Sequence, residues 1–400
     1  MSGFILSLHI YFYTKRKKMN HNFLLWILCF GVFGILSTEL GMMGIIPIVA
    51  QKFSVSIDDA GWSVSVFALM IVFCAPIAPL LGSKFAPKKL MLFCLAIFSL
   101  TSLAAAFVDS FWALLICRAI PAFFHPIYIA LALSMAASLA TTKEESLKNT
   151  AKVFAGVSAG MVLGVPIASF LGGNYSFAFA MGFFALCTSL AFIATLLFVP
   201  NMTNNEAPKI TTQLEILKFP FLWVSIFAVV CVNAGVFGFY SYFSDFLHSI
   251  TQVSFDFISV VLAVYGSMNI VGNIIAGKAL AKNANATILA TLLGMICLYA
   301  LIFVFAKQGV VLLIFAVLLG ILAGVVNNAT HYVITHPYPQ APDFTNGLFL
   351  SIANIGLSTG VALCGLCISL LNTQYTALCA IVLLSMGVAT MLFRMRLEKA

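Results

Sequence analysis

Residues 23–50 of the chain read FLLWILCFGVFGILSTELGMMGIIPIVA, an apolar run that contains one charged side chain, Glu39. About 20 apolar residues in a helix cross a bilayer core of about 30 Å, so this run is long enough to span a membrane. The whole chain has a similarly apolar composition, because 62% of its 400 residues are hydrophobic and 8% are charged. Soluble proteins carry about 25% charged residues, since their surfaces face water. The sequence therefore predicts an all-α membrane protein embedded in the lipid bilayer.

Apolar runs separated by charged and turn-forming clusters predict twelve transmembrane helices. The predicted spans are 23–50, 60–82, 89–108, 111–138, 150–172, 176–199, 220–246, 257–277, 285–306, 309–333, 345–370 and 375–394. The longest polar interval inside the chain lies at its midpoint and leaves six spans on each side. The predicted units are an N-terminal extension (1–22), a first six-helix half (23–199), a linker (200–219), a second six-helix half (220–395) and a tail (396–400).

The placement of lysine and arginine predicts the orientation of these spans. With the N-terminus inside, 17 of the 20 Lys and Arg residues fall in cytoplasmic segments, two fall outside, and Arg118 lies within a span. Cytoplasmic loops of membrane proteins are enriched in Lys and Arg, so we expect a multi-pass protein of the cell (inner) membrane with both termini cytoplasmic. This distribution accounts for the net charge of +8 without a nucleic-acid partner.

The first 18 residues place an apolar stretch before Lys15–Lys18, which reverses the order of a signal peptide. They are interpreted either as a frayed extension or as the product of an upstream start, with Met19 as the natural one. The ten cysteines all lie in apolar runs, including Cys364-x-x-Cys367. They are expected to pack as small hydrophobic residues, and no metal site is predicted.

Glycines at a spacing of four suggest an internal repeat. The fifth span carries Gly156, Gly160 and Gly164, and the eleventh carries Gly356 and Gly360 at an offset of 200 residues. Such spacing allows neighbouring helices to approach closely. Its recurrence in both halves predicts two pseudo-symmetric six-helix units, a plan that is typical of secondary transporters.

Several stretches carry a resemblance to a known family. They are Thr38–Pro47, Ser65–Leu69 with Ala75-Pro76, Arg118 through Phe124-His125-Pro126, Leu163–Pro166 with Gly172-Gly173, and Ala353–Gly356 with Gly360. From residue 23 onward the chain resembles the major facilitator superfamily, and more narrowly its twelve-span sugar-efflux and drug:proton antiporter branch. The resemblance implies a small-molecule substrate, no cofactor and a monomeric protein. It also implies that Gly160, Gly164 and Pro166 pack the fifth span as the antiporter motif does.

The chain departs from the family pattern at three places. The loop from Gly82 to Lys89 lacks the usual aspartate, and Pro121-Ala122 replaces the usual Gln-Gly after Arg118. Gly164-Val165-Pro166 is one residue longer than the antiporter Gly-Pro pair, as in sugar-efflux relatives.

Glu39 and Arg118 are the two charges deep within the predicted spans. At 1.5 Å per helical residue they lie roughly 12 Å and 10 Å from the outer ends of the first and fourth spans. Charged groups at such depth are costly, so each requires a reason to be there. One interpretation is that Glu39 binds and releases a coupling proton while Arg118 tunes it. The alternative is a fixed ion pair that holds two helices together.

His125 lies two helical turns after Arg118, on nearly the same face of the fourth span. It is interpreted as a second proton site or a substrate donor, or else as a neutral packed histidine beside Pro121 and Pro126.

Polar side chains in the second half are candidate substrate contacts, and Tyr242, Asn328 and Asn354 are the selected ones. The alternative for each is an interhelical hydrogen bond. Aspartates at the predicted outer ends of spans are expected to be solvated or to cap helices; they are Asp58, Asp59, Asp245 and Asp256.

The sequence favours proton-coupled efflux of a small organic solute, such as a sugar, a related metabolite or a drug, by alternating access. Proton-driven uptake is the alternative, although the motif of the fifth span resembles exporters. A membrane-embedded enzyme is disfavoured, because no HExxH, GxSxG or P-loop motif occurs. A channel is disfavoured because no filter-like loop or charge ring is evident.

Overall fold

The computed structural model describes residues 21–75, 85–201, 214–338 and 342–397, and the secondary structure within these residues is entirely helical. Residues 1–20, with most of the predicted N-terminal extension and Met19, lie outside the described residues. So do 76–84, most of the predicted linker, and 398–400.

The first half contains six crossings of the bundle. The first is built from α2 (His21–Leu40), the 3₁₀ turn η1 (Gly41–Ile45) and α3 (Ile46–Phe53). The next three are α4 (Ile57–Cys74), α6 (Pro87–Ala105) and α7 (Phe111–Ser138). The fifth joins α8 (Lys143–Ala159), the π-turn η2 (Gly160–Gly164) and α9 (Val165–Asn174), and α10 (Phe177–Phe198) is the sixth.

The second half begins with η3 (Leu214–Lys218), which precedes α12 (Pro220–Ser241). The seventh crossing continues through α13 (Phe243–Asp245) and the π-turn η4 (Phe246–Ile250). The remaining elements are α14 (Phe255–Val304), α15 (Gly309–Thr335), α16 (Pro342–Leu370), η5 (Thr373–Tyr375) and α17 (Thr376–Leu397).

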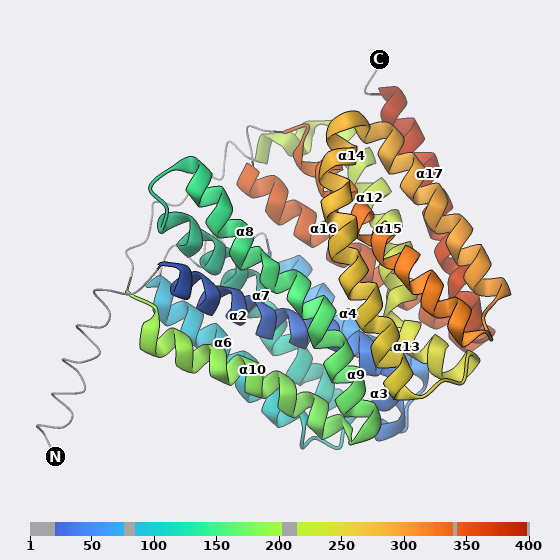
Figure 1. The fold of residues 1–400 in the computed structure, drawn as a ribbon, viewed down its shortest axis with the longest axis horizontal. Helices are drawn as coiled ribbons and strands as arrows, with labels where there is room; N and C mark the ends of the chain where they lie inside the picture. Colours follow the sequence, from blue (N-terminus) through green and yellow to red (C-terminus); the bar gives the residue numbers. More distant parts are fainter. Residues whose placement is uncertain (1–20, 76–84, 202–213, 339–341, 398–400) are drawn as a thin grey trace, which may run out of the picture.

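The long element α14 is two crossings joined by a reversal at Asn283. Its backbone there is non-helical (φ −158°, ψ 94°), and the Asn283 side chain accepts from the main-chain nitrogen of Ala286, as an N-cap does. The Thr287 hydroxyl donates to the carbonyl oxygen of Ala279 at 3.0 Å, which closes the reversal. Figure 1 shows the chain turning back at this point. Eleven described helical segments are long and apolar enough to cross a membrane, and since α14 crosses twice, the predicted count of twelve is confirmed.

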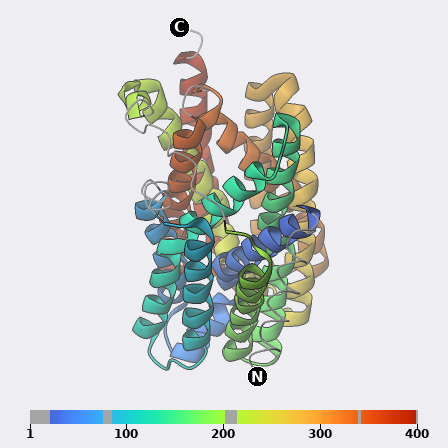
Figure 2. The same ribbon diagram turned by 90° about the vertical axis from the view of Figure 1, so that its left-hand side faces the viewer.

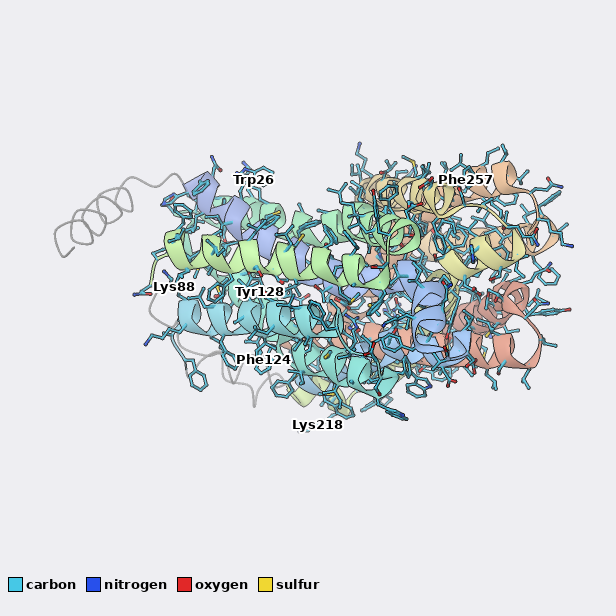
Figure 3. The ribbon with its side chains drawn as sticks, turned by 90° about the horizontal axis from the view of Figure 1, so that it is seen from below. Trp26, Lys88, Phe124, Tyr128, Lys218 and Phe257 are labelled. Carbon is cyan, nitrogen blue, oxygen red and sulfur yellow. The ribbon has the colours of Figure 1, made fainter. Side chains whose placement is uncertain are left out.

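Large apolar side chains cover the outside of the bundle. Trp26 is 68% exposed and Trp112 is 76% exposed, and Figure 3 shows Trp26 pointing away at the edge of the molecule while Tyr128 lies between helices. Exposing such apolar side chains to water would be energetically unfavourable, whereas lipid solvates them. The exterior therefore fits a bilayer.

The glycine repeat makes the same helix contact in both halves. In the first half, a Cβ on Gly160 would lie 2.7 Å from Leu36 Cβ, so the fifth span packs directly on the first. In the second half, a Cβ on Gly356 would lie 2.7 Å from Asn233 Cβ, so the eleventh packs in the same way on the seventh. The predicted pseudo-symmetry is thus confirmed in the packing.

The two halves meet at one end of the bundle, which we call the closed end and which carries the connections 54–56 and 251–254. Ser244 Oγ donates to the carbonyl oxygen of Gly44 at 2.9 Å, and Asn174 Nδ2 donates to Asp256 Oδ1 at 2.7 Å. Figures 1 and 2 show the halves running at an angle and meeting around α3, α9 and α13. Ser244 and Gly44 are 200 residues apart, the repeat offset, so the pseudo-twofold axis passes near their contact.

Close packing of the fifth span on the first can be tested at Gly164, where a Cβ would lie 2.4 Å from Ser37 Oγ. Gly164→Val should lower the free energy of unfolding by about 1–3 kcal/mol, as overpacking does, and reduce the melting temperature of the purified protein. The matched control is Gly182→Val, since nothing lies within 4 Å of that position. Equal melting temperatures for the two variants would contradict this packing.

Candidate proton and substrate site

The Arg118 guanidinium is buried in the first half and is bonded to main-chain oxygens of two other crossings. Its Nε donates to the carbonyl oxygen of Ser63 at 3.1 Å, and its Nη atoms donate to those of Thr38 (2.6 Å) and Glu39 (3.3 Å). A buried charge is tolerated only when its hydrogen-bonding groups are satisfied. The helix changes from α to 3₁₀ at Gly41, so Arg118 bonds the backbone at the point where the regular α-helical pattern ends.

Phe67 of α4 supports this cation and its neighbour on α7. The Arg118 guanidinium carbon lies 4.4 Å from the centroid of the Phe67 ring, a cation–π contact. The same ring meets the His125 ring edge to face at 6.0 Å. Arg118 and His125 therefore share one face of α7, as their spacing predicted.

Glu39 pairs with His125 through its side chain. The Nε2 atom of His125 lies 2.9 Å from Glu39 Oε2, and the side chains are 4% and 11% exposed. The carboxylate oxygen lies off the direction of the imidazole N–H, and both His125 ring nitrogens lack a hydrogen bond among the described residues. The contact is thus a close approach of two titratable groups rather than a linear hydrogen bond. Arg118 donates to the main-chain oxygen of Glu39, and among the described residues the Glu39 carboxylate makes its ion-pair-distance contact with His125 rather than with Arg118.

The π-turn η2 explains the extra residue of the Gly-Val-Pro stretch. In η2 the main-chain nitrogen of Val165 bonds the carbonyl oxygen of Gly160, one residue farther than in an α-helix. Pro166 follows at the start of α9, where its missing N–H is tolerated. Gly160 and Gly164 both face the first span, next to the segment that carries Glu39.

The three substrate candidates of the second half are placed differently from one another. The Tyr242 hydroxyl donates to the carbonyl oxygen of Val361 at 3.1 Å and touches Gly61 of α4. Asn328 Nδ2 donates to Asn273 Oδ1 at 2.8 Å, which links α15 to α14. In this structure Tyr242 and Asn328 therefore hold helices together.

Asn354 retains binding capacity. Its Nδ2 donates to the carbonyl oxygen of Leu350, while its Oδ1 is buried without a partner. Asn233 has the same arrangement, with Nδ2 bonded to the carbonyl oxygen of Val229 and Oδ1 unpaired, and the Tyr240 hydroxyl is also buried and unpaired. The amides of the second half thus leave two acceptor oxygens that no described group satisfies. Asn233 and Tyr240 belong to the wider set of polar candidates in the second half, although the selected residues of the seventh and eleventh spans were Tyr242 and Asn354.

The expectation that Asp245 is solvated or a cap is wrong. Its side chain is buried (1% exposed), and its carboxylate accepts from the Thr373 hydroxyl at 2.6 Å and from the Ser249 hydroxyl at 2.8 Å. The seventh crossing does not end near residue 246 but turns through η4, which folds Asp245 against η5. The spacing of four between Asp245 and Ser249 is the sequence signal that indicates this turn.

The other three aspartates lie where they were expected, near the surface of the closed end. Asp59 follows the N-cap Ser56 of α4, Asp58 lies beside it, and Asp256 is in the first turn of α14. Among the described residues, no group of three or more His, Cys, Asp or Glu side chains is arranged to hold a metal ion.

Comparisons with known proteins agree with this architecture. The family model for the Major Facilitator Superfamily matches residues 25–341. The chain is 26% identical over 351 residues to the inner membrane transport protein YdhP of Escherichia coli, which covers 88% of this chain and 90% of that protein. It is 26% identical over 341 residues to a Helicobacter pylori protein named "Probable sugar efflux transporter", with coverage of 85% and 86%.

Solved structures share the fold at low sequence identity. A mutant of the nucleoside transporter NupG superposes with a TM-score of 0.80 at 16% identity, covering 94% of this chain and all of that one. A bacterial homologue of the lysosomal transporter Spinster, inward-facing and unoccupied, gives a TM-score of 0.75 at 15% identity, covering 95% and 98%. The chain belongs to the major facilitator superfamily and is a multi-pass membrane transporter, not an enzyme.

Proposed function

We propose that this transporter exports a small polar organic solute, most simply a sugar, in exchange for protons, and that Glu39 is the proton-binding group. The observation that carries the proposal is the Glu39–His125 approach at 2.9 Å in a membrane interior that is otherwise nearly free of charge. Ionisable groups at this depth usually mark ion or proton pathways. The protein acts as a monomer in this proposal, as the superfamily resemblance implies.

The charges around Glu39 define what one proton does there. With Glu39 ionised, Arg118 charged and His125 neutral, the site has no net charge. A proton that enters is taken up by the carboxylate or by the imidazole, and the site then carries one positive charge. An added charge is costly in a medium of low dielectric constant, so proton uptake favours a different arrangement of the surrounding helices. In alternating access, that arrangement is the one open to the other side.

The second half supplies groups suited to a neutral, hydroxylated solute. The unpaired Oδ1 atoms of Asn233 and Asn354 are acceptors for hydroxyl donors, and both amides are buried. Charged partners are absent from this set, which fits a neutral substrate. The printed name of the Helicobacter pylori relative supports a sugar.

Glu39→Gln should abolish proton flux driven by substrate in liposomes that contain a pH dye, because glutamine cannot bind the proton. His125→Asn should reduce this flux while retaining some coupling, because the imidazole is one of the two groups that can take up the proton in this proposal. A panel of sugars, nucleosides, amino acids and drugs identifies the solute. The matched control is Glu145→Gln, which alters an exposed carboxylate at the start of α8 and should leave flux unchanged.

Three outcomes of that assay decide the proposal. Proton flux opposite to solute flux supports export, and flux in the same direction replaces it with uptake. Substrate-dependent proton flux that persists in Glu39→Gln removes Glu39 from the coupling role. Solute movement without proton flux contradicts coupling altogether.

Arg118 is proposed to fix the backbone at Glu39 while remaining charged throughout the cycle. Arg118→Lys keeps the charge but loses the fork of donors to three carbonyl groups. Each lost bond to a charged group is worth about 1.5–3 kcal/mol, so the variant should unfold at a clearly lower temperature. Arg396→Lys, at an exposed position near the C-terminus, is the control. A melting temperature unchanged by Arg118→Lys would contradict this role.

The closed end is proposed to face the outside, because the lysines and arginines gather at the opposite end. Asp109→Cys places a thiol at the closed end, where that side chain is 91% exposed. A membrane-impermeant maleimide should label it in intact cells, and Leu397→Cys at the other end should react only after permeabilisation. The reverse pattern would invert the topology.

A further inference from the structure

We propose that Asp245 is a second proton-binding site, in the second half of the protein, which is reached from the closed end and controls the opening of that end. The inference rests on the proposed transport cycle only in requiring that the closed end opens. It does not depend on Glu39 or on the identity of the solute.

Asp245 is a buried acid in the wall of a cavity at the closed end. Its two oxygens accept from Thr373 and Ser249, and neither donor carries a charge. The carboxylate also lines a cavity of about 420 Å³ at the closed end. Residues of both halves form its walls, and they include Gln51, Ser56, His248 and Phe255. A proton from this side therefore reaches Asp245 without crossing the bundle.

The titratable groups around Asp245 leave it without a close cationic partner among the described residues. On its own element, His248 stacks on the Phe255 ring at 4.6 Å. The groups on the elements packed nearby have other contacts: Lys52 pairs with Asp109, Asp59 accepts from Ser56, Asp256 accepts from Asn174, Asp58 lies beside Gly365, and Tyr375 packs on Phe303. Among these groups, a positive charge on His248 would favour the ionised form of Asp245.

The position of Asp245 connects its charge to the contact between the halves. The preceding residue, Ser244, donates to the carbonyl oxygen of Gly44 across the pseudo-twofold axis. Tyr242 touches Gly61 and donates to Val361. These residues lie on the irregular end of the seventh crossing, and the bond from Thr373 to Asp245 fixes that segment to η5.

Protonation changes those bonds in a defined way. The carboxylate takes one proton and becomes neutral, so Thr373 and Ser249 both lose a charged acceptor, and the protonated oxygen becomes a donor. Hydrogen bonds to a charged acceptor are roughly twice as strong as neutral ones. The segment that carries Ser244 is then held less firmly, and opening of the closed end becomes easier. A low pH on the side of the closed end thus favours the state in which the central site is open to that side.

A thiol at Val361 reports this opening, because that residue is 1% exposed in the closed state and lies where Tyr242 bridges to α16. The labelling rate of Val361→Cys by an impermeant maleimide is divided by that of Gln308→Cys. Gln308 is exposed and lies outside the cavity, so the ratio removes the pH dependence of thiol reactivity. We expect this ratio to rise by about threefold from neutral to mildly acidic pH, the effect of one weakened charge-assisted bond. In Asp245→Asn, which mimics the neutral acid, it should be high at every pH.

Thr373→Val gives a second, independent readout. It removes a donor that favours the ionised carboxylate, so the pH midpoint of the ratio should move upward by about one unit. Asp109→Asn, at an exposed carboxylate of the same end, should leave both ratio and midpoint unchanged. The experiment also separates the two proposals, because Glu39→Gln should remove coupled flux and preserve this midpoint. A ratio that is independent of pH in the parent, or a midpoint unaffected by both Asp245→Asn and Thr373→Val, would overturn the assignment.

Discussion

Burial of a permanent positive charge at Arg118 constrains the first half more than any other single interaction. A guanidinium inside the bilayer must satisfy its donors, and here main-chain oxygens of the first and second crossings accept from it. This requirement brings α2, α4 and α7 together at one depth. The carboxylate of Glu39 then approaches His125, while the Arg118 donors are bonded to the backbone.

The two halves share a scaffold but divide the chemistry. Glycines at equivalent positions pack the fifth span on the first and the eleventh on the seventh. The buried charges at mid-depth occur in the first half, while the second half presents amides with unpaired acceptor oxygens. A duplicated frame whose first half holds Glu39, Arg118 and His125 and whose second half holds unpaired amides suits exchange of a proton for a neutral solute, since each ligand then meets its own set of groups.

At the closed end, short polar contacts join the halves within an interface that also contains buried apolar side chains. The bonds from Ser244 to Gly44 and from Asn174 to Asp256 are local and few, so modest changes in charge nearby alter the balance between open and closed states. Asp245 lies one residue from such a contact and lines a cavity whose walls come from both halves. The irregular end of the seventh crossing carries both Ser244, which contacts Gly44, and Asp245.

The sequence by itself determined the membrane class, the twelve crossings, the duplicated plan and the two deep charges. These follow from composition and spacing, because lipid requires long apolar helices and penalises each buried charge strongly. Only the tertiary structure decided that the Glu39 carboxylate meets His125, that Asn328 and Tyr242 bind other helices, and that Asp245 is buried. Which side chains contact one another depends on the rotation of each helix and on local turns such as η1 and η4. Both are set by packing between segments far apart in the chain. Apolar periodicity carries little of that information when nearly every face of a helix is apolar.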